Sequence, residues 1–238
     1  MVHDGIKDYW NARDNKLFEK GKISYLDPHK IGNQGILDAL KGAEKYAKGE
    51  LLDIGCGTKP YQDLFKNVDR YIGIDMPAEN NKSADIFGDG LKLPFRSNVI
   101  DTILSTQVIE HVEEPKEILN EAYRVLKTGG HLILTAPMVW ELHVEPYDYY
   151  RFTKYGLKYL AKSTGFHIIE IKAETGCWGV IGQRMSDYAY TSKGAPKSLL
   201  GEIFKRSLCA SIQLFFMCLD KICRNEKETL GYIMVARK

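Results

Sequence analysis

Short apolar runs alternate with segments of helical spacing along most of the chain. The runs have the length and the aliphatic content of buried strands. The clearest predicted strands span residues 50–54, 70–74, 99–105 and 131–136. Between them the apolar positions recur every three or four residues, which is typical of helices that pack against a sheet. The clearest predicted helices span residues 31–48, 115–127 and 154–163.

Weaker runs and boundary residues complete the pattern. The additional predicted strands span residues 84–87, 167–173 and 231–236. Pro115 and Thr153 stand where a helix begins, and Pro60 predicts another helix start in the same way. Strands that alternate with helices predict an α/β fold with a doubly wound, mostly parallel sheet.

The run from Leu51 to Ile54 leads directly into a glycine turn, Gly55-Cys56-Gly57. Glycine permits positive φ angles and lets a ligand approach the bare backbone. Asp75 ends the next predicted strand, about 20 residues later, the spacing at which a carboxylate accepts hydrogen bonds from a ribose. This combination indicates a nucleotide-binding crossover, although a glycine turn alone also occurs in proteins that bind nothing.

The turn departs from the dinucleotide fingerprint. Lys59 and Pro60 occupy the region where a third glycine and a pyrophosphate are expected. A nucleoside without phosphates would still need the ribose acid, so the pattern favours such a ligand.

Five segments, in this order, resemble motifs of the class I S-adenosylmethionine (SAM) dependent methyltransferases. They are Leu-Asp-Ile-Gly-Cys-Gly (52–57), Gly-Ile-Asp (73–75), Gly-Asp-Gly-Leu-Lys-Leu-Pro-Phe (88–95), Ser-Thr-Gln-Val-Ile-Glu-His-Val (105–112) and Tyr-Arg-Val-Leu-Lys-Thr-Gly-Gly-His-Leu-Ile-Leu (123–134). The resemblance covers residues 30–175 and the last strand. It implies a seven-stranded sheet whose last strand runs antiparallel beside the strand at 167–173.

The resemblance also divides the chain and implies a cofactor, SAM, with S-adenosylhomocysteine as its product. In this division, residues 1–30 are an N-terminal cap segment, which either closes over the cofactor or only packs against the rest of the protein. The SAM-binding domain comprises residues 31–175 and 229–238. Residues 176–228 become a partly helical insertion that contacts substrate, a second copy or a membrane.

By the same resemblance, particular residues hold the cofactor. Gly55 and Gly57 pass under its methionine end, and Asp53 either holds the amino group or orders the turn. Asp75 binds the ribose. The remaining cofactor-binding candidates are Asp89 at the adenine amino group, Leu91 beside the adenine ring and Gln107 on the methyl-donor side.

Composition narrows the remaining possibilities. A length of 238 residues suits one domain, and the net charge of +2 predicts no nucleic-acid partner. The five cysteines are scattered without CxxC spacing, which predicts neither a zinc site nor a disulfide framework, and no metal site is expected. No apolar leader follows Met1, so a cytoplasmic protein is expected.

The segment 137–152 is the candidate acceptor-binding loop. It gathers histidine, carboxylates, arginine and aromatics after the strand at 131–136, at the predicted carboxyl edge of the sheet. His143 is the candidate general base, and Asp148 either orients it or takes the proton itself. The candidate substrate-binding residues are Trp140, Tyr149 and Arg151.

The alternative for this loop is structural. The aromatic side chains would then cover the core, and Arg151 would pair with a nearby acid. Glu110 and His111, from the Glu-His-Val motif, are interpreted as structural rather than catalytic. Loops with the pattern His-x-x-Pro-x-Asp-x-x-Arg-Phe-Thr are similar to those of methyltransferase-like proteins associated with cell-surface glycan synthesis, which favours a sugar or glycolipid hydroxyl as acceptor.

The insertion holds two features of interest. Residues 176–184 are rich in glycine and predict a mobile flap over the substrate. Residues 199–223 have helical spacing and many apolar side chains, but the uninterrupted run is shorter than the roughly 20 residues that span a bilayer. This helix belongs to a core or dimer interface, or it forms an amphipathic surface that meets a membrane or a lipid-linked substrate.

These patterns favour a SAM-dependent methyltransferase that acts on the oxygen of a small-molecule, sugar or lipid-linked acceptor. Two alternatives stay open. One is a SAM-binding regulatory module without catalysis, and the other is a nucleotide-dependent oxidoreductase, which the missing third glycine disfavours.

Overall fold

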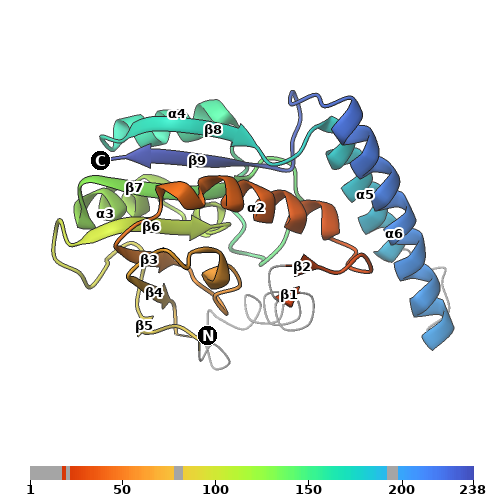
Figure 1. Ribbon diagram of the computed structural model, residues 1–238, viewed down its shortest axis with the longest axis horizontal. Helices are drawn as coiled ribbons and strands as arrows, with labels where there is room; N and C mark the ends of the chain where they lie inside the picture. Colours follow the sequence, from red (N-terminus) through yellow and green to blue (C-terminus); the bar gives the residue numbers. More distant parts are fainter. Residues whose placement is uncertain (1–17, 20–21, 78–82, 192–197) are drawn as a thin grey trace.

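The computed structural model describes residues 18–19, 22–77, 83–191 and 198–238 (Figure 1). The strands are β1 (Phe18–Glu19), β2 (Lys22–Ile23), β3 (Glu50–Ile54), β4 (Arg70–Asp75), β5 (Ile86–Phe87), β6 (Ile100–Thr106), β7 (Leu126–Pro137), β8 (His167–Ala173) and β9 (Gly231–Arg237). The α-helices are α2 (Lys30–Ala43), α3 (Pro115–Val125), α4 (Lys154–Ser163), α5 (Cys177–Thr191) and α6 (Leu199–Ile222). The 3₁₀ helices are η1 (Glu44–Tyr46), η2 (Gln62–Leu64) and η3 (Ile109–His111).

The central sheet has seven strands in the order β5-β4-β3-β6-β7-β9-β8. All neighbouring strands run parallel except β9, which is antiparallel to both β7 and β8. The predicted doubly wound sheet and its antiparallel last strand are therefore confirmed. The carboxyl ends of the parallel strands meet at one edge, on the right in Figure 1, where ligands bind in open α/β sheets.

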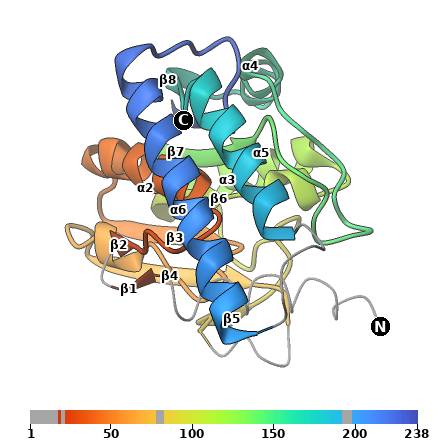
Figure 2. The same cartoon turned by 90° about the vertical axis from the view of Figure 1, so that its right-hand side faces the viewer.

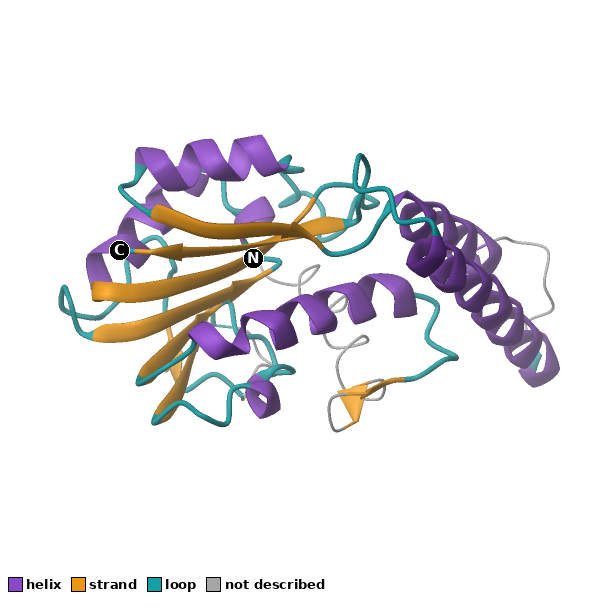
Figure 3. Cartoon of the chain, turned by 45° about the horizontal axis from the view of Figure 1, so that its top comes forward, coloured by secondary structure: helices purple, strands orange, loops and turns teal. Residues whose placement is uncertain are grey.

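Helices cover both faces of this sheet (Figure 3). On one face Ile36 and Leu40 of α2 pack against Leu51 of β3 and Ile133 of β7. On the other face, side chains of α3 and α4 pack against the opposite sides of the same strands. Because β3 and β7 are buried on both faces, they appear in the sequence as continuous apolar runs and can be predicted easily from it.

The helices α5 and α6 form an antiparallel hairpin at the carboxyl edge of the sheet (Figures 1 and 2). One side of α6 is buried at a helical interval, at Gly201, Cys209, Gln213, Phe216 and Asp220. Apolar side chains are exposed elsewhere on α6, at Leu199, Leu200, Ile203, Phe204, Leu208, Leu214, Phe215 and Ile222. Among the described residues, no helix is both long and apolar enough to cross a membrane.

Buried amides attach this hairpin to the start of α2. The N-cap residue of α2, His29, gives no side-chain cap. Instead, the side-chain oxygen of Gln213 accepts from the Ile31 amide at 3.1 Å, and that of Gln183 accepts from the Gly32 amide at 3.1 Å. The hairpin therefore satisfies amide groups that a helix start leaves without intrahelical partners.

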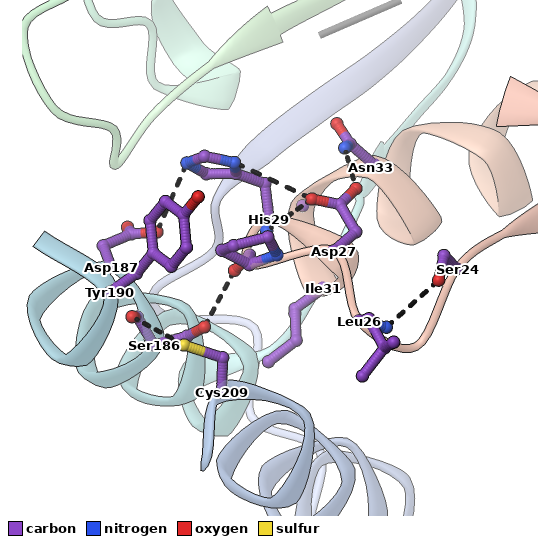
Figure 4. A network of polar contacts seen from close by, with 12 residues as sticks. Ser24, Leu26, Asp27, His29, Ile31, Asn33, Ser186, Asp187, Tyr190 and Cys209 are labelled. Carbon is purple, nitrogen blue, oxygen red and sulfur yellow. Dashed lines mark hydrogen bonds and ion pairs between the residues drawn. The ribbon is translucent and has the colours of Figure 1, made fainter. Parts of the chain in front are cut away.

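A second set of contacts lies beside these amides (Figure 4). Ser186 Oγ donates to the Pro28 carbonyl at 2.8 Å, and His29 lies between the carboxylates of Asp27 and Asp187 at 3.8 and 3.7 Å. Cys209 Sγ of α6 contacts the carbonyl of Ser186 at 3.4 Å. Polar contacts thus fix the position of the hairpin relative to the sheet.

The structure corrects several predicted elements. The segment after Pro60 forms only η2, because the Gly55–Pro60 turn leads into a short connection before β4. Residues 176–184 form the start of α5 rather than a flap, and Gly182 lies against Phe216, where a Cβ would collide with that ring. The predicted helix 115–127 ends at Val125, since Leu126 already pairs with Ile100 as a strand residue.

Two further predicted helices are confirmed, and one predicted segment is described only in part. The helix at 31–48 is confirmed as α2 followed by η1, and the helix at 199–223 is confirmed as α6. Most of the predicted N-terminal cap segment lies outside the described residues, and its described part comprises the β1–β2 pair and the turn that leads into α2.

We expect Gln213→Leu to lower the free energy of unfolding by about 1–3 kcal/mol, because it leaves the Ile31 amide and the Asp27 carbonyl buried without this partner. Urea denaturation measures the change. Ser211→Ala, at an exposed position of the same helix, is the control and should stay within about 0.5 kcal/mol of the wild type. Equal stability of Gln213→Leu and the control would show that this contact does not hold the hairpin.

Candidate functional site

The glycine turn follows β3 at the carboxyl edge of the sheet. Gly55 and Gly57 have φ angles of 71° and 51°, in the region that favours glycine. A Cβ at Gly55 would collide with Val108, which follows β6. The turn is thus held directly beside the segment that contains Gln107.

Asp75, at the end of β4, supports the turn from the neighbouring strand. Its Oδ2 accepts from the Gly57 amide at 2.8 Å, and its Oδ1 accepts from the Met76 amide at 2.8 Å. These hydrogen bonds fix the carboxylate at the carboxyl edge, beside the turn.

Asp53 is buried in β3, below the turn, and accepts a hydrogen bond from the Tyr71 hydroxyl. Burial raises the pKa of Asp53 to about 7, while the bond from Tyr71 acts to lower it. This contact links β3 to β4 below the turn. The two roles that the sequence predicts for Asp53, holding the amino group or ordering the turn, stay predictions.

The stability of the protein should therefore depend on Asp53 between about pH 4 and pH 7. The folded-state pKa is raised above the unfolded value, so protonated Asp53 contributes stability at low pH, and this contribution is lost as the pH rises towards 7. We expect Asp53→Asn to flatten the fall of the unfolding free energy, which is up to about 1.4 kcal/mol per pH unit in this window for one such group.

The measurement is urea denaturation at a series of pH values. Asp63→Asn, at an exposed carboxylate of η2, is the matched control. A pH slope in Asp53→Asn equal to that of the wild type and the control would contradict the assignment.

Next to Asp75, the edge of the sheet carries exposed apolar side chains and a second acid. Parallel pairing places Asp75 beside Phe87 of β5. Met76, Phe87 and Leu91 are 42%, 53% and 38% exposed, which is unusual for large apolar side chains. Asp89 shapes the turn before Leu91, since its Oδ1 accepts from the Leu91 amide at 2.8 Å.

A pocket lies on the other side of the glycine turn, between α2 and the ends of β6, β7 and β8. Its lining residues are Gly32, Ile36, Gln107, Trp140, His143, Glu174 and Leu230. A Cβ at Gly32 would lie 2.8 Å from the indole ring of Trp140, so glycine is needed for this ring position. Gln107, whose side-chain amide donates to Thr135 Oγ1 at 3.0 Å, lines the pocket next to the segment that contacts Gly55.

The loop after β7 brings His143, Asp148 and Arg151 together. His143 Nδ1 lies 3.2 Å from Asp148 Oδ2 and 3.1 Å from the Glu141 carbonyl. Arg151 donates to both carboxylate oxygens of Asp148, at 2.6 and 2.7 Å. Burial, helped by the neighbouring His111, lowers the pKa of His143 to about 4, so its imidazole is neutral at pH 7. Burial acts to raise the pKa of Asp148, but the hydrogen bonds from Arg151 and from the His143 amide lower it to about 2.

Glu174, directly after β8, is a pocket residue that the sequence analysis does not select. Its carboxyl group lies over Gly231, where a Cβ would be 2.9 Å from the carboxyl carbon of Glu174. Burial and the nearby carboxylate of Glu110 raise its pKa to about 8. An acid at the end of a predicted parallel strand is the signal that could have identified it.

The other predicted site residues divide between these two regions. Gly55, Gly57, Asp75, Asp89 and Leu91 lie on the turn and beyond it, while Gln107, Trp140 and His143 line the pocket. Tyr149 is not among the lining residues, and its hydroxyl donates to Glu113 at 2.9 Å. The guanidinium of Arg151 is hydrogen-bonded within its own loop, to Asp148 and to the Glu141 carbonyl at 2.7 Å.

Residues 52–134 match the family model described as a methyltransferase domain. This match covers about a third of the chain, and together with the strand order it identifies a Rossmann-like methyltransferase fold. The cofactor of such a domain is SAM. The match contains the glycine turn, Asp75, Asp89 and Gln107, and it argues against the oxidoreductase alternative.

Two curated relatives cover about half of the chain. The uncharacterized protein MJ1123 of Methanocaldococcus jannaschii is 35% identical over 135 residues, which is 54% of this chain and 60% of that protein. The ubiquinone/menaquinone biosynthesis C-methyltransferase UbiE of Ruegeria sp. is 42% identical over 142 residues, which is 56% of this chain and 53% of that protein. The chain thus spans less than two thirds of the length of either relative.

A solved structure has the same fold. Phosphoethanolamine N-methyltransferase 2 of Haemonchus contortus, in complex with SAM, matches with a TM-score of 0.56 and 21% identity, over 87% of this chain and 52% of that one. This likeness supports the fold of the methyltransferase domain.

The residues at the carboxyl edge fit the cofactor. A fixed carboxylate at Asp75 suits ribose hydroxyls, and the exposed apolar side chains of Met76, Phe87 and Leu91 offer a surface that an adenine ring would cover. The glycine turn lies between this surface and the pocket, so the methionine end of SAM would reach towards Gln107.

We expect Asp75→Ala to weaken SAM binding by about tenfold or more, because the hydrogen bonds of a charged group are lost. Isothermal titration calorimetry with SAM measures this loss, and thermal melting checks that the protein is folded. Asp75→Asn, which keeps an acceptor for the Gly57 amide, separates the ribose contact from support of the turn. Unchanged affinity in both variants would remove Asp75 from the SAM site.

Proposed function

We propose that the protein transfers the methyl group of SAM to a hydroxyl oxygen of a small-molecule, sugar or glycolipid acceptor. The observation that carries this proposal is the pocket that adjoins the glycine turn through Gln107. The reacting end of an acceptor in this small pocket would lie beside the methionine end of the cofactor.

Methyl transfer requires little of the protein beyond the correct placement of SAM and the acceptor. SAM supplies a methyl group on a positively charged sulfonium, and the acceptor displaces it directly. The protein must bring the two together and exclude water, and proximity provides much of the rate. Ile36, Trp140 and Leu230 give the pocket apolar walls that serve this purpose.

A hydroxyl acceptor also has to lose a proton, and His143 is the proposed base. Two acceptors, the Glu141 carbonyl and Asp148 Oδ2, surround its Nδ1, so the proton of the neutral ring belongs on Nδ1 and Nε2 is the basic atom. Asp148 is the positioning residue, because Arg151 holds its carboxylate on both oxygens. Trp140 would contact the acceptor, and Tyr149 and Arg151 would shape the loop around it.

Two further observations support a sugar or glycolipid as the acceptor. The loop pattern from His143 to Thr153 resembles that of proteins associated with cell-surface glycan synthesis. The exposed apolar side chains of α6 suit contact with the lipid part of a glycolipid. Carbon is the second candidate for the accepting atom, because the UbiE relative is described as a C-methyltransferase.

We expect His143→Ala to reduce kcat by about 100-fold or more, the usual contribution of a general base, while SAM affinity changes little. The assay follows methyl transfer from deuterated-methyl SAM to sugar and glycolipid acceptors by mass spectrometry. Nuclear magnetic resonance of the product then assigns the methyl group to oxygen or carbon. An unchanged kcat would exclude His143 as the base.

Two other results would redirect the proposal. Tight SAM binding without transfer to any acceptor would favour the SAM-binding regulatory module. A product methylated on carbon would replace the hydroxyl acceptor with a carbon nucleophile.

A further inference from the structure

Next to the pocket, Glu110, His111 and His143 come together from two segments. Glu110 and His111 belong to η3, after β6, while His143 belongs to the loop after β7. The amides of Tyr149 and Tyr150 donate to the Glu110 carbonyl at 2.9 and 3.2 Å, which fastens the loop to η3. The fold itself therefore holds these two segments together.

The three side chains lie at metal-ligand spacing. One ligand atom of each, a carboxylate oxygen or a ring nitrogen, lies within 4.8 Å of those of the others. His111 Nε2 is 3.8 Å from Glu110 Oε1, and the two imidazole rings meet edge to face with centroids 4.7 Å apart. Small side-chain movements would bring these atoms to one cation, since cation–ligand distances are about 2 Å.

Both histidines are oriented as metal ligands usually are. His111 Nδ1 lies 2.7 Å from the Tyr147 carbonyl, and His143 Nδ1 contacts the Glu141 carbonyl and Asp148. In each ring the proton therefore belongs on Nδ1, and Nε2 carries the lone pair. A carbonyl or carboxylate behind a histidine ligand fixes the tautomer and the ring orientation in metal sites.

One buried ring nitrogen of the cluster lacks a hydrogen-bond partner among the described residues. This atom is His111 Nε2. A buried lone pair without a donor costs free energy, and a cation would satisfy it. Glu110, which is fully buried, would supply negative charge to the same cation.

We propose that Glu110, His111 and His143 bind a divalent transition-metal cation at the wall of the acceptor pocket. Two imidazoles and one carboxylate are the ligands that Zn²⁺, Fe²⁺ and Co²⁺ accept readily, whereas Mg²⁺ prefers an all-oxygen environment. Because three protein ligands leave open positions, the cation could also bind the acceptor oxygen and lower the pKa of its hydroxyl, and in the metal-bound protein His143 Nε2 would be a ligand rather than the base. Only this last use of the metal rests on the proposed function.

The sequence predicts no metal site, because its cysteines are not paired at CxxC spacing. These ligands instead come from neighbouring residues of the Glu-His-Val motif and from a histidine more than 30 residues later. The fold alone brings them together.

The test uses the whole chain after treatment with a chelator, in the absence of SAM and acceptor. Co²⁺ is the probe, because its visible absorption reports histidine and carboxylate ligands and a thiolate ligand would add a charge-transfer band. We expect one Co²⁺ per chain without the thiolate band. His111→Gln and Glu110→Gln should lower the affinity by about tenfold or more. His167→Ala, which removes an exposed histidine at the start of β8, should bind as the wild type does.

Thermal melting of each variant without metal shows whether it is folded, and the stabilisation by Co²⁺ should vanish in His111→Gln. Equal Co²⁺ affinity in the wild type and the ligand variants, or no binding to the wild type, would overturn the proposal. SAM titration of the metal-free protein is independent of this result, so failure of the metal site and failure of the cofactor site remain distinguishable.

Discussion

The parallel arrangement of β3, β4, β6, β7 and β8 is the constraint on which the site depends. Parallel strands deliver the segment that follows each of them to the same edge of the sheet. The glycine turn, Asp75, Gln107, the loop that contains His143 and Glu174 each follow or end one of these strands. Residues spread over more than 100 positions of the sequence thus meet at one edge. The proposed cofactor site and the proposed acceptor pocket lie side by side for this reason.

The antiparallel strand β9 has the opposite effect and is equally necessary. Because β9 enters the sheet at the carboxyl edge, the chain must remain there after β8, and residues 176–228 have to be accommodated beside the site. They form the α5–α6 hairpin, whose buried Gln183 and Gln213 satisfy the first amides of α2. The hairpin therefore supports the wall of the pocket, since the same turn of α2 supplies Gly32 to the pocket.

The sequence predicts the sheet well, because strands that are buried on both faces leave uninterrupted apolar runs and their order follows from the alternation with helices. Local signals fail where tertiary contacts decide the conformation. Pro60 suits a helix start, yet the short link to β4 leaves room only for η2. The glycines at 176–184 suggest a flap, but in the structure small residues let α5 approach α6 closely, as Gly182 does against Phe216.

The candidate cofactor residues follow motifs with fixed spacing and can be proposed from the sequence, as can Trp140 and His143 of the pocket, whereas the contacts that complete the pocket cannot. Glu174 and Gly231 lie on different strands, and only the register of β8 and β9 shows that one makes room for the other. Likewise, the sequence predicts a structural role for Glu110 and His111, because nothing in it places His143 beside them.

The charges around the pocket limit the acceptor further. Glu110 and Glu174 place two buried carboxyl groups at or beside its wall, and burial, together with the nearby Glu110 carboxylate, raises the pKa of Glu174 to about 8. The nearest cationic side chain in the loop, Arg151, is committed to Asp148 through two short hydrogen bonds. An anionic group in the pocket would therefore meet carboxyl groups without a compensating cation from this loop, and its desolvation would be costly. In the metal-free protein, the proposed acceptor would therefore insert a neutral or positively charged part into the pocket more readily than a phosphate.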